Sequence, residues 1–171
     1  MSARSADPRG SVSVGAEVPA GGILLPPSVL DAIRRHAERG YPHEVCGFLL
    51  GEPDSAARRF TVRTLLPAEN RRADLARTRY LIDPEAYRVA EREAAALGLD
   101  IAGFYHSHPD APACPSEFDR EHGWPSIAYV IVTVGTKGAG EATGWILADD
   151  RSRFVSLALE HVDHPIPEPA S

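Results

Sequence analysis

Cysteine is scarce in this chain of 171 residues, which carries only Cys46 and Cys114. Two cysteines are too few for a disulfide framework or for a four-cysteine zinc site. We expect both thiols to be reduced and at least one of them to lie in the core. Pairing of the two thiols, or a metal contact made by Cys114, is the less favoured interpretation.

Long hydrophobic runs are also missing. The longest run, residues 127–134, is far shorter than the about 20 residues needed to cross a bilayer, so we read it as a strand. Arg4 and Arg9 are followed by no apolar stretch, and the N-terminus therefore does not look like a secretory signal. We expect no membrane association and take the cytoplasm as the default location.

Basic residues are in the minority, with 18 Lys and Arg against 24 Asp and Glu and a formal net charge of −6. Nonspecific affinity for nucleic acid comes from clustered Lys and Arg. The charge therefore argues against a protein whose main role is to bind nucleic acid. Hydrophobic residues at 43% and charged residues at 25% are close to globular averages, so the body of the chain should fold.

One compact domain is predicted between two loose ends. Residues 1–20 are rich in Ser, Gly, Ala and Pro without periodicity, which predicts a flexible tail, and residues 164–171 are similar. The length suits one core over residues 21–163 better than two domains of ordinary size. No repeat or low-complexity linker divides that stretch.

Short alternating elements fill the predicted domain. Strands are predicted at residues 22–25, 45–51, 60–66, 99–108, 127–134, 144–147 and 153–159. A helix is predicted from Ser28 as N-cap to about Gly40, a second from Pro84 to a C-terminal Gly98, and a short third one from Ser116. Helices mixed with strands predict an α/β layered domain, a sheet with helices packed on it.

The segment that carries chemistry is GFYHSHPDAPACPSEFDREHGW, residues 103–124. At the end of a strand, His106 and His108 share one face, because side chains alternate with a period of two. Ser116 opens a helix in which Asp119 lies one turn in and faces back towards the strand end. Two imidazoles and a carboxylate are therefore predicted to converge on one metal ion.

Two histidines and one carboxylate leave a fourth tetrahedral position for water, which is typical of catalytic rather than structural zinc. Zinc lowers the pKa of that water to about 7 and polarises a carbonyl. Glu44, just before the apolar run VCGFLLG, is the predicted base that activates the water, although Glu52 lies nearby. Ser116 is the predicted hydroxyl donor to the developing oxyanion.

Each half of this pattern also has an ordinary explanation. Two histidines on a strand can both be surface residues, and Ser116 followed by Asp119 is an ordinary helix start that resembles a capping box. The full H-x-H-x7-S-x2-D spacing is much rarer by accident than either half. The joint pattern therefore favours a metal site, and capping and catalysis do not compete for Ser116.

The other histidines are not read as ligands. His43-Glu44 does not begin an H-E-x-x-H zinc motif, because position 47 is Gly rather than His. His36 fits a helix face, and His161 and His164 flank the loose C-terminal segment. Solvent exposure is expected for these three side chains.

At these residues the sequence resembles the JAMM/MPN+ metalloprotease family in its compact, stand-alone prokaryotic form. The family pattern is an upstream Glu followed by H-x-H-x7-S-x2-D, and both HEVCGFLLGE and GLDIAGFYHSHP extend the likeness to roughly residues 22–159. The resemblance implies a cytidine-deaminase-like layered α-β-α domain with a mixed central sheet. It also implies one zinc ion per chain on His106, His108 and Asp119, with Glu44 as the water-activating base.

The resemblance further implies a substrate class. Compact members are similar to enzymes that hydrolyse the amide or isopeptide bond after the C-terminal Gly-Gly of a ubiquitin-like or sulfur-carrier protein. A homodimer is compatible with an enzyme of this size, but no residue pattern specifies one. The resemblance alone does not name the natural partner.

Two other functions stay open. Metal-free members of the same fold serve as interaction modules, although such members typically lose one or more of the ligand positions. The RadC family, which is associated with DNA repair, has nearly the same H-x-H-x7-S-x2-D spacing. That alternative expects a DNA-binding N-terminal region, whereas this chain has a short polar tail there and an acidic net charge.

Overall fold

The computed structural model describes residues 21–69 and 82–162. The two predicted tails, 1–20 and 164–171, lie outside these residues. The elements follow the order β1 (Gly22–Leu25), α1 (Pro27–Gly40), β2 (Cys46–Asp54), β3 (Arg59–Ala68), α2 (Pro84–Ala96), β4 (Asp100–Pro109), α3 (Glu117–His122), β5 (Ala128–Gly135), β6 (Gly138–Leu147) and β7 (Phe154–His161).

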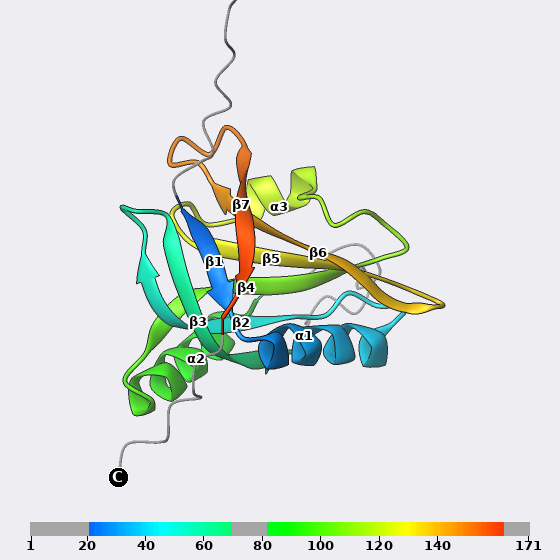
Figure 1. The fold of residues 1–171 in the computed structure, drawn as a ribbon, viewed down its shortest axis with the longest axis horizontal. Helices are drawn as coiled ribbons and strands as arrows, with labels where there is room; N and C mark the ends of the chain where they lie inside the picture. The colour runs from blue at the N-terminus through cyan, green and yellow to red at the C-terminus, as the bar shows by residue number, and fades with distance from the viewer. Residues whose placement is uncertain (1–20, 70–81, 163–171) are drawn as a thin grey trace, which may run out of the picture.

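All the described strands belong to one mixed sheet (Figure 1). The strand order is β1-β3-β2-β4-β5-β6-β7, and β7 pairs back with β1, so the sheet closes on itself. Strand β1 runs parallel to β3 and β7, and β4 runs parallel to β5, whereas the other neighbours are antiparallel. The mixed sheet predicted from the sequence is thereby confirmed.

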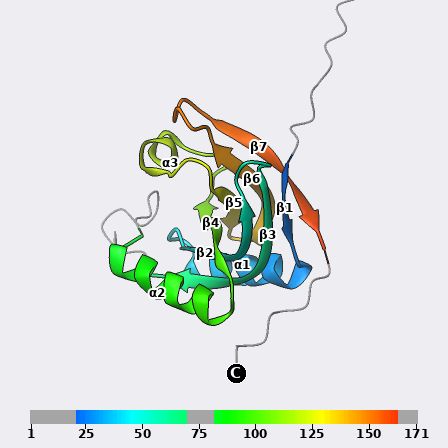
Figure 2. The ribbon, with the colours of Figure 1, turned by 90° about the vertical axis from the view of Figure 1, so that its left-hand side faces the viewer.

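The central strands bury side chains on both faces. Tyr105 of β4 lies in a core with the apolar face of α1, whereas its neighbour Phe104 lies in a second core with Ala90 and Ala94 of α2. Figure 2 shows α2 and α3 on the same side of β4. Helices therefore cover both faces of the central strands, while the likeness to cytidine deaminases in particular stays a prediction.

The start of α1 differs from the predicted one. Ser28 is not the N-cap: Pro26 takes that place and Pro27 is the first helical residue. Proline suits a first helical position because its φ is already helical and its missing N–H would have no intrahelical acceptor there. The apolar stripe of α1 is buried as its spacing predicts, with Val29 and Ile33 among its members.

The end of α2 agrees with the prediction. Gly98 adopts the left-handed φ of 66° in the position after the C-cap Leu97. The N–H of Gly98 donates to Ala95 O and the N–H of Leu99 donates to Ala94 O. These two bonds form a Schellman motif, which satisfies the last carbonyls of the helix and turns the chain into β4.

Strand β6 is much longer than the predicted residues 144–147, because it begins at Gly138. Its first half is poor in strand-forming residues but pairs with β5 from Gly135 to Val132. On β6, the residues that pair with strand β7 are Gly144 to Leu147 alone. Beyond that point two side chains of α1 bond to the strand backbone: Glu38 accepts from Ala139 N at 2.9 Å and Arg34 donates to Gly140 O at 3.5 Å.

None of the helices in the described ranges is both long enough and apolar enough to cross a bilayer.

Gly103 provides a test of how tightly the central strands pack. A Cβ on Gly103 would collide with the backbone carbonyl of Ala128 on β5, which cannot move without separating β4 from β5. Gly103→Ala is therefore expected to lower the free energy of unfolding by about 1–3 kcal/mol in denaturant titration.

Gly135→Ala is the matched control, since its new Cβ would meet only a side-chain oxygen of Asp110 at 3.3 Å. Its effect should stay within about 0.5 kcal/mol. Equal losses of unfolding free energy in the two variants would show that the close approach of β4 to β5 is unimportant for stability.

Candidate metal centre

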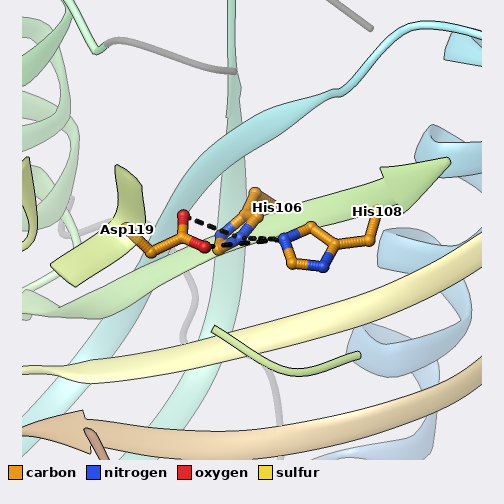
Figure 3. A group of neighbouring side chains, drawn as sticks. All are labelled: His106, His108 and Asp119. Atoms are coloured by element: carbon orange, nitrogen blue, oxygen red, sulfur yellow. Dashed lines mark hydrogen bonds and ion pairs between the residues drawn. The ribbon is translucent and has the colours of Figure 1, made fainter. Parts of the chain in front are cut away.

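Three side chains converge where β4 ends and α3 begins (Figure 3). His106 and His108 extend from β4, and Asp119 extends from the first turn of α3. Their exposed fractions are 0%, 7% and 4%, and one potential ligand atom from each lies within 4.8 Å of the others. The predicted convergence of the three residues is confirmed, whereas metal binding by them stays a prediction.

The spacing of the three residues fits a small tetrahedral cation. Nε2 of His106 lies 3.1 Å from Nε2 of His108 and 3.2 Å from Oδ1 of Asp119, while Nε2 of His108 lies 3.6 Å from Oδ2 of Asp119. Ligands about 2.0–2.1 Å from a tetrahedral zinc ion are about 3.3–3.4 Å apart. The separations lie on both sides of that value, although the two histidines are nearest to different oxygens of Asp119, and one ligand atom from each residue lies within 4.8 Å of the others, close enough to share one zinc ion.

A loop carbonyl sets the orientation of His108. Nδ1 of this ring lies 2.7 Å from the carbonyl oxygen of Pro112. Because a carbonyl oxygen only accepts, Nδ1 carries a proton and donates it, so in the neutral ring the Nε2 lone pair faces His106 and Asp119. A backbone partner of this kind fixes the tautomer that a metal ligand requires.

The N-terminus of α3 fixes Asp119. Ser116 is the N-cap: its Oγ accepts from Asp119 N at 3.1 Å, while its own N and Oγ both donate to Asp119 Oδ2 at 2.6 Å. The capping box that the sequence resembles is therefore present. It holds the carboxylate towards β4, so a local helix signal positions one of the three converging groups.

The charge states of two of the three side chains, Asp119 and His106, suit a cation. Despite burial, hydrogen bonds to Asp119 and to the carbonyl of Pro112 raise the pKa of His108. Burial works against ionisation of Asp119, but His106 and hydrogen bonds from His106, His108 and Ser116 outweigh it and keep the pKa of Asp119 well below its ordinary value. Burial lowers the pKa of His106 despite the attraction of Asp119. An ionised carboxylate and a neutral imidazole are the forms that bind a metal.

Glu44 lies beside the trio, just before β2. It is 7% exposed and lines a cleft of about 300 Å³ together with His108 and Ser116. Burial raises the pKa of its carboxyl group to about 7, with His108 opposing the rise and Asp119 adding to it. Glu52, the other nearby glutamate, is exposed and bonds to Arg63 at 2.9 Å. Of the two glutamates, the structure brings Glu44 to the trio.

Ser107 is a residue of this site that the motif does not reveal. It stands between the two histidines in the sequence and is fully buried. Its Oγ accepts from Val45 N at 3.0 Å, and its N donates to Val45 O at 3.0 Å. These bonds fix the residue next to Glu44 against β4, so Ser107 positions Glu44. The available signal was a small polar residue inside a strand that is otherwise buried.

The other predicted residues have mixed outcomes. Cys46 is buried, which confirms the expected core thiol, while Cys114 is exposed on the wall of the Glu44 cleft, and both thiols are free. His161 is exposed as expected. The prediction for His36 was wrong: it is partly buried, and its Nδ1 lies 2.8 Å from the hydroxyl of Tyr105, whose ring reaches α1 through the sheet core. His164 lies outside the described residues.

A family model describing prokaryotic homologs of the JAB domain matches residues 26–153, which include Glu44 and the three converging residues. The chain belongs to this family. The match confirms the resemblance to stand-alone prokaryotic JAMM/MPN proteins that the motif indicates.

Several similar proteins match most of the chain. It is 38% identical over 144 residues to the desampylase of Haloferax volcanii, covering 81% of this chain and 96% of that one. It is 33% identical over 116 residues to a probable TtuB-protein conjugate cleaving protease of Thermus thermophilus, covering 68% and 72%. A Salinibacter ruber protein solved in solution is 40% identical, with a TM-score of 0.64 over 86% of this chain and 95% of that one.

The raised pKa of Glu44 predicts a pH-dependent stability difference. Below its ordinary pKa of 4.5 the carboxyl group is protonated in both the folded and unfolded states, so burial costs nothing extra. Between pH 4.5 and about 7 the unfolded chain loses this proton while the folded protein retains it, so stability falls over that range, and above it the folded protein buries a charge. In metal-free protein, Glu44→Gln should therefore raise the free energy of unfolding by up to about 3 kcal/mol at pH 8 and by little at pH 4.5.

Denaturant titrations at the two pH values, with a chelator present, measure this difference. Glu52→Gln is the control, since that exposed carboxylate should show no such gain at high pH. A stability change for Glu44→Gln that is the same at both pH values would contradict the buried, proton-retaining state of Glu44.

Proposed function

We propose that this protein is a zinc-dependent isopeptidase that hydrolyses the amide bond after the C-terminal Gly-Gly of a ubiquitin-like or sulfur-carrier protein. The observation that carries the proposal is the buried trio of His106, His108 and Asp119, with Glu44 in a cleft that His108 also lines. One zinc ion per chain, bound by the trio, and a cytoplasmic location are parts of the same proposal.

The names of the relatives support this substrate class. One relative is a desampylase and another is a probable protease that cleaves TtuB-protein conjugates. The match between this chain and the desampylase covers 96% of the desampylase, so the likeness extends over nearly the whole of that protein. Hydrolysis of a bond between a small protein and its conjugate is the activity that these names share.

The residues divide the chemistry between them. Zinc in this site would supply a Lewis acid that polarises the scissile carbonyl and makes hydroxide available at neutral pH. Glu44 takes the proton of the attacking water and delivers it to the leaving amine as the C–N bond breaks. A pKa of about 7 suits this exchange, because the group can then both accept and release a proton at ambient pH.

Ser116 has two roles in this proposal. Its hydroxyl donates to Oδ2 of Asp119 and so orients that carboxylate. The same side chain lines the Glu44 cleft, where a turn of the hydroxyl would let it donate to the oxyanion that forms on the substrate carbonyl. The complete ligand set favours this enzyme over a silent interaction module of the same fold.

Metal content together with cleavage is the direct test. Wild type should contain about one zinc per chain by elemental analysis and should cut Gly-Gly-terminated carrier fusions. His108→Ala and Asp119→Ala should each lose the zinc and at least a hundredfold of kcat/KM, because each removes a ligand. His161→Ala, an exposed histidine on β7, is the matched control and should keep both properties.

The same experiment separates the alternatives. Well-folded wild type with neither metal nor cleavage would overturn the enzyme and favour the interaction module. Binding of labelled DNA that weakens steeply with salt, in the absence of cleavage, would favour the RadC-like alternative.

Glu44→Gln tests the base separately from the metal. This variant should keep its zinc and a KM close to that of wild type, while kcat falls by about 10²–10⁴-fold because no group moves the proton. Steady-state kinetics on the same fusions, with zinc content measured in parallel, give the result. Full kcat in this variant would show that another group, not Glu44, acts as the base.

A further inference from the structure

An apolar pocket adjoins the trio and is separate from the cleft that Glu44 lines. It has a volume of about 350 Å³ and lies between α2 and α3, with Asp119 in its wall. Phe104, two residues before His106 on the same face of β4, also lines it. The pocket therefore adjoins the candidate metal centre and shares Asp119 with it.

Aromatic rings make up much of this pocket. Tyr87 of α2 lies 5.0 Å from Trp124 between ring centroids, and Trp124 lies 5.7 Å from Phe104. Trp124 is 48% exposed, and among the described residues it is the one large hydrophobic side chain that is exposed. An exposed tryptophan at the mouth of an apolar pocket is typical of a binding site.

The charged groups around the pocket do not select a charged ligand. Arg88 and Glu91 of α2 contribute one charge of each sign to its lining. The carboxylate of Asp119 is already engaged by Ser116 and the two histidines. Its volume is more than ten times the about 30 Å³ that a water molecule occupies and lies near the lower end of the range for ligand pockets. A single large apolar side chain suits such a space.

The position of Glu44 gives the substrate a direction. Two hollows flank the trio: the cleft lined by Glu44, His108 and Ser116, and the aromatic pocket beyond Asp119. Under the proposed function, Glu44 delivers a proton to the leaving amine, so the leaving group must lie in the Glu44 cleft. The carrier tail, on the other side of the scissile bond, then runs towards the aromatic pocket.

We propose that the aromatic pocket binds a large apolar side chain carried by one of the two residues that precede the Gly-Gly of the carrier tail. This inference rests on the proposed function. The two glycines have no side chains with which to fill a pocket, and an extended chain advances about 3.3 Å per residue. The third or fourth residue from the tail end is thus the first able to place a side chain beyond Asp119.

Carrier fusions with three designed tails test the pocket. The tails end in Leu-Ala-Gly-Gly, Ala-Leu-Gly-Gly and Ala-Ala-Gly-Gly. Burial of one leucine side chain corresponds to about a tenfold to hundredfold gain, so wild type should prefer one leucine tail to the alanine tail by that factor in kcat/KM, mainly through KM. Only one of the two leucine positions should show the gain.

The pocket variants are Tyr87→Ala and Trp124→Ala. In each, the ratio of kcat/KM between the preferred leucine tail and the alanine tail should fall to within about threefold. Tyr87→Phe should retain the preference, since it keeps the ring, and Arg92→Ala, an exposed position on α2 outside the pocket lining, should behave as wild type. Zinc content measured on every variant excludes indirect damage to the metal centre.

The outcomes separate this inference from the proposed function. Cleavage of all three tails at equal rates by wild type, or an undiminished preference in both alanine variants, would overturn the pocket assignment while leaving the isopeptidase intact. Absence of cleavage of every tail by zinc-loaded wild type would overturn the proposed function, and the pocket assignment with it.

Discussion

Taking one carboxylate and two imidazoles out of water is the physical demand around which this domain is arranged. An ionised carboxylate that is 4% exposed is stable only with strong local compensation. Ser116 supplies two donors to Asp119, and the two histidine rings face its oxygens. The strand, the loop carbonyl of Pro112 and the first turn of α3 must all be in place for this compensation. The site therefore depends on the sheet, the loop and the helix together.

The sequence predicts best where the controlling interactions are local. The end of α2 follows from one glycine in a left-handed conformation, and the start of α3 follows from Ser116 and its partner three residues later. The H-x-H spacing on β4 is equally local, because alternation along a strand decides which side chains share a face. These are the parts of the fold and of the candidate site that could be derived without coordinates.

Interactions between distant segments account for the differences. The first half of β6 is a strand because β5 and α1 bind its backbone, although its own residues favour no strand. His36 is partly buried because Tyr105, 69 positions away, reaches it through the core. The aromatic pocket joins α2 to α3, and Ser107 bonds to Val45, 62 positions away. No pattern within a short window of sequence encodes these contacts.

The contacts of α1 with β6 bear on how this molecule meets other chains. A strand whose neighbour stops partway exposes backbone donors and acceptors that invite pairing with any extended polypeptide. Here the N–H of Ala139 and the carbonyl of Gly140 are already bonded to Glu38 and Arg34, two charged side chains on successive turns of one helix. An unrelated peptide approaching this margin meets charge and occupied hydrogen bonds, which discourages self-association at high concentration.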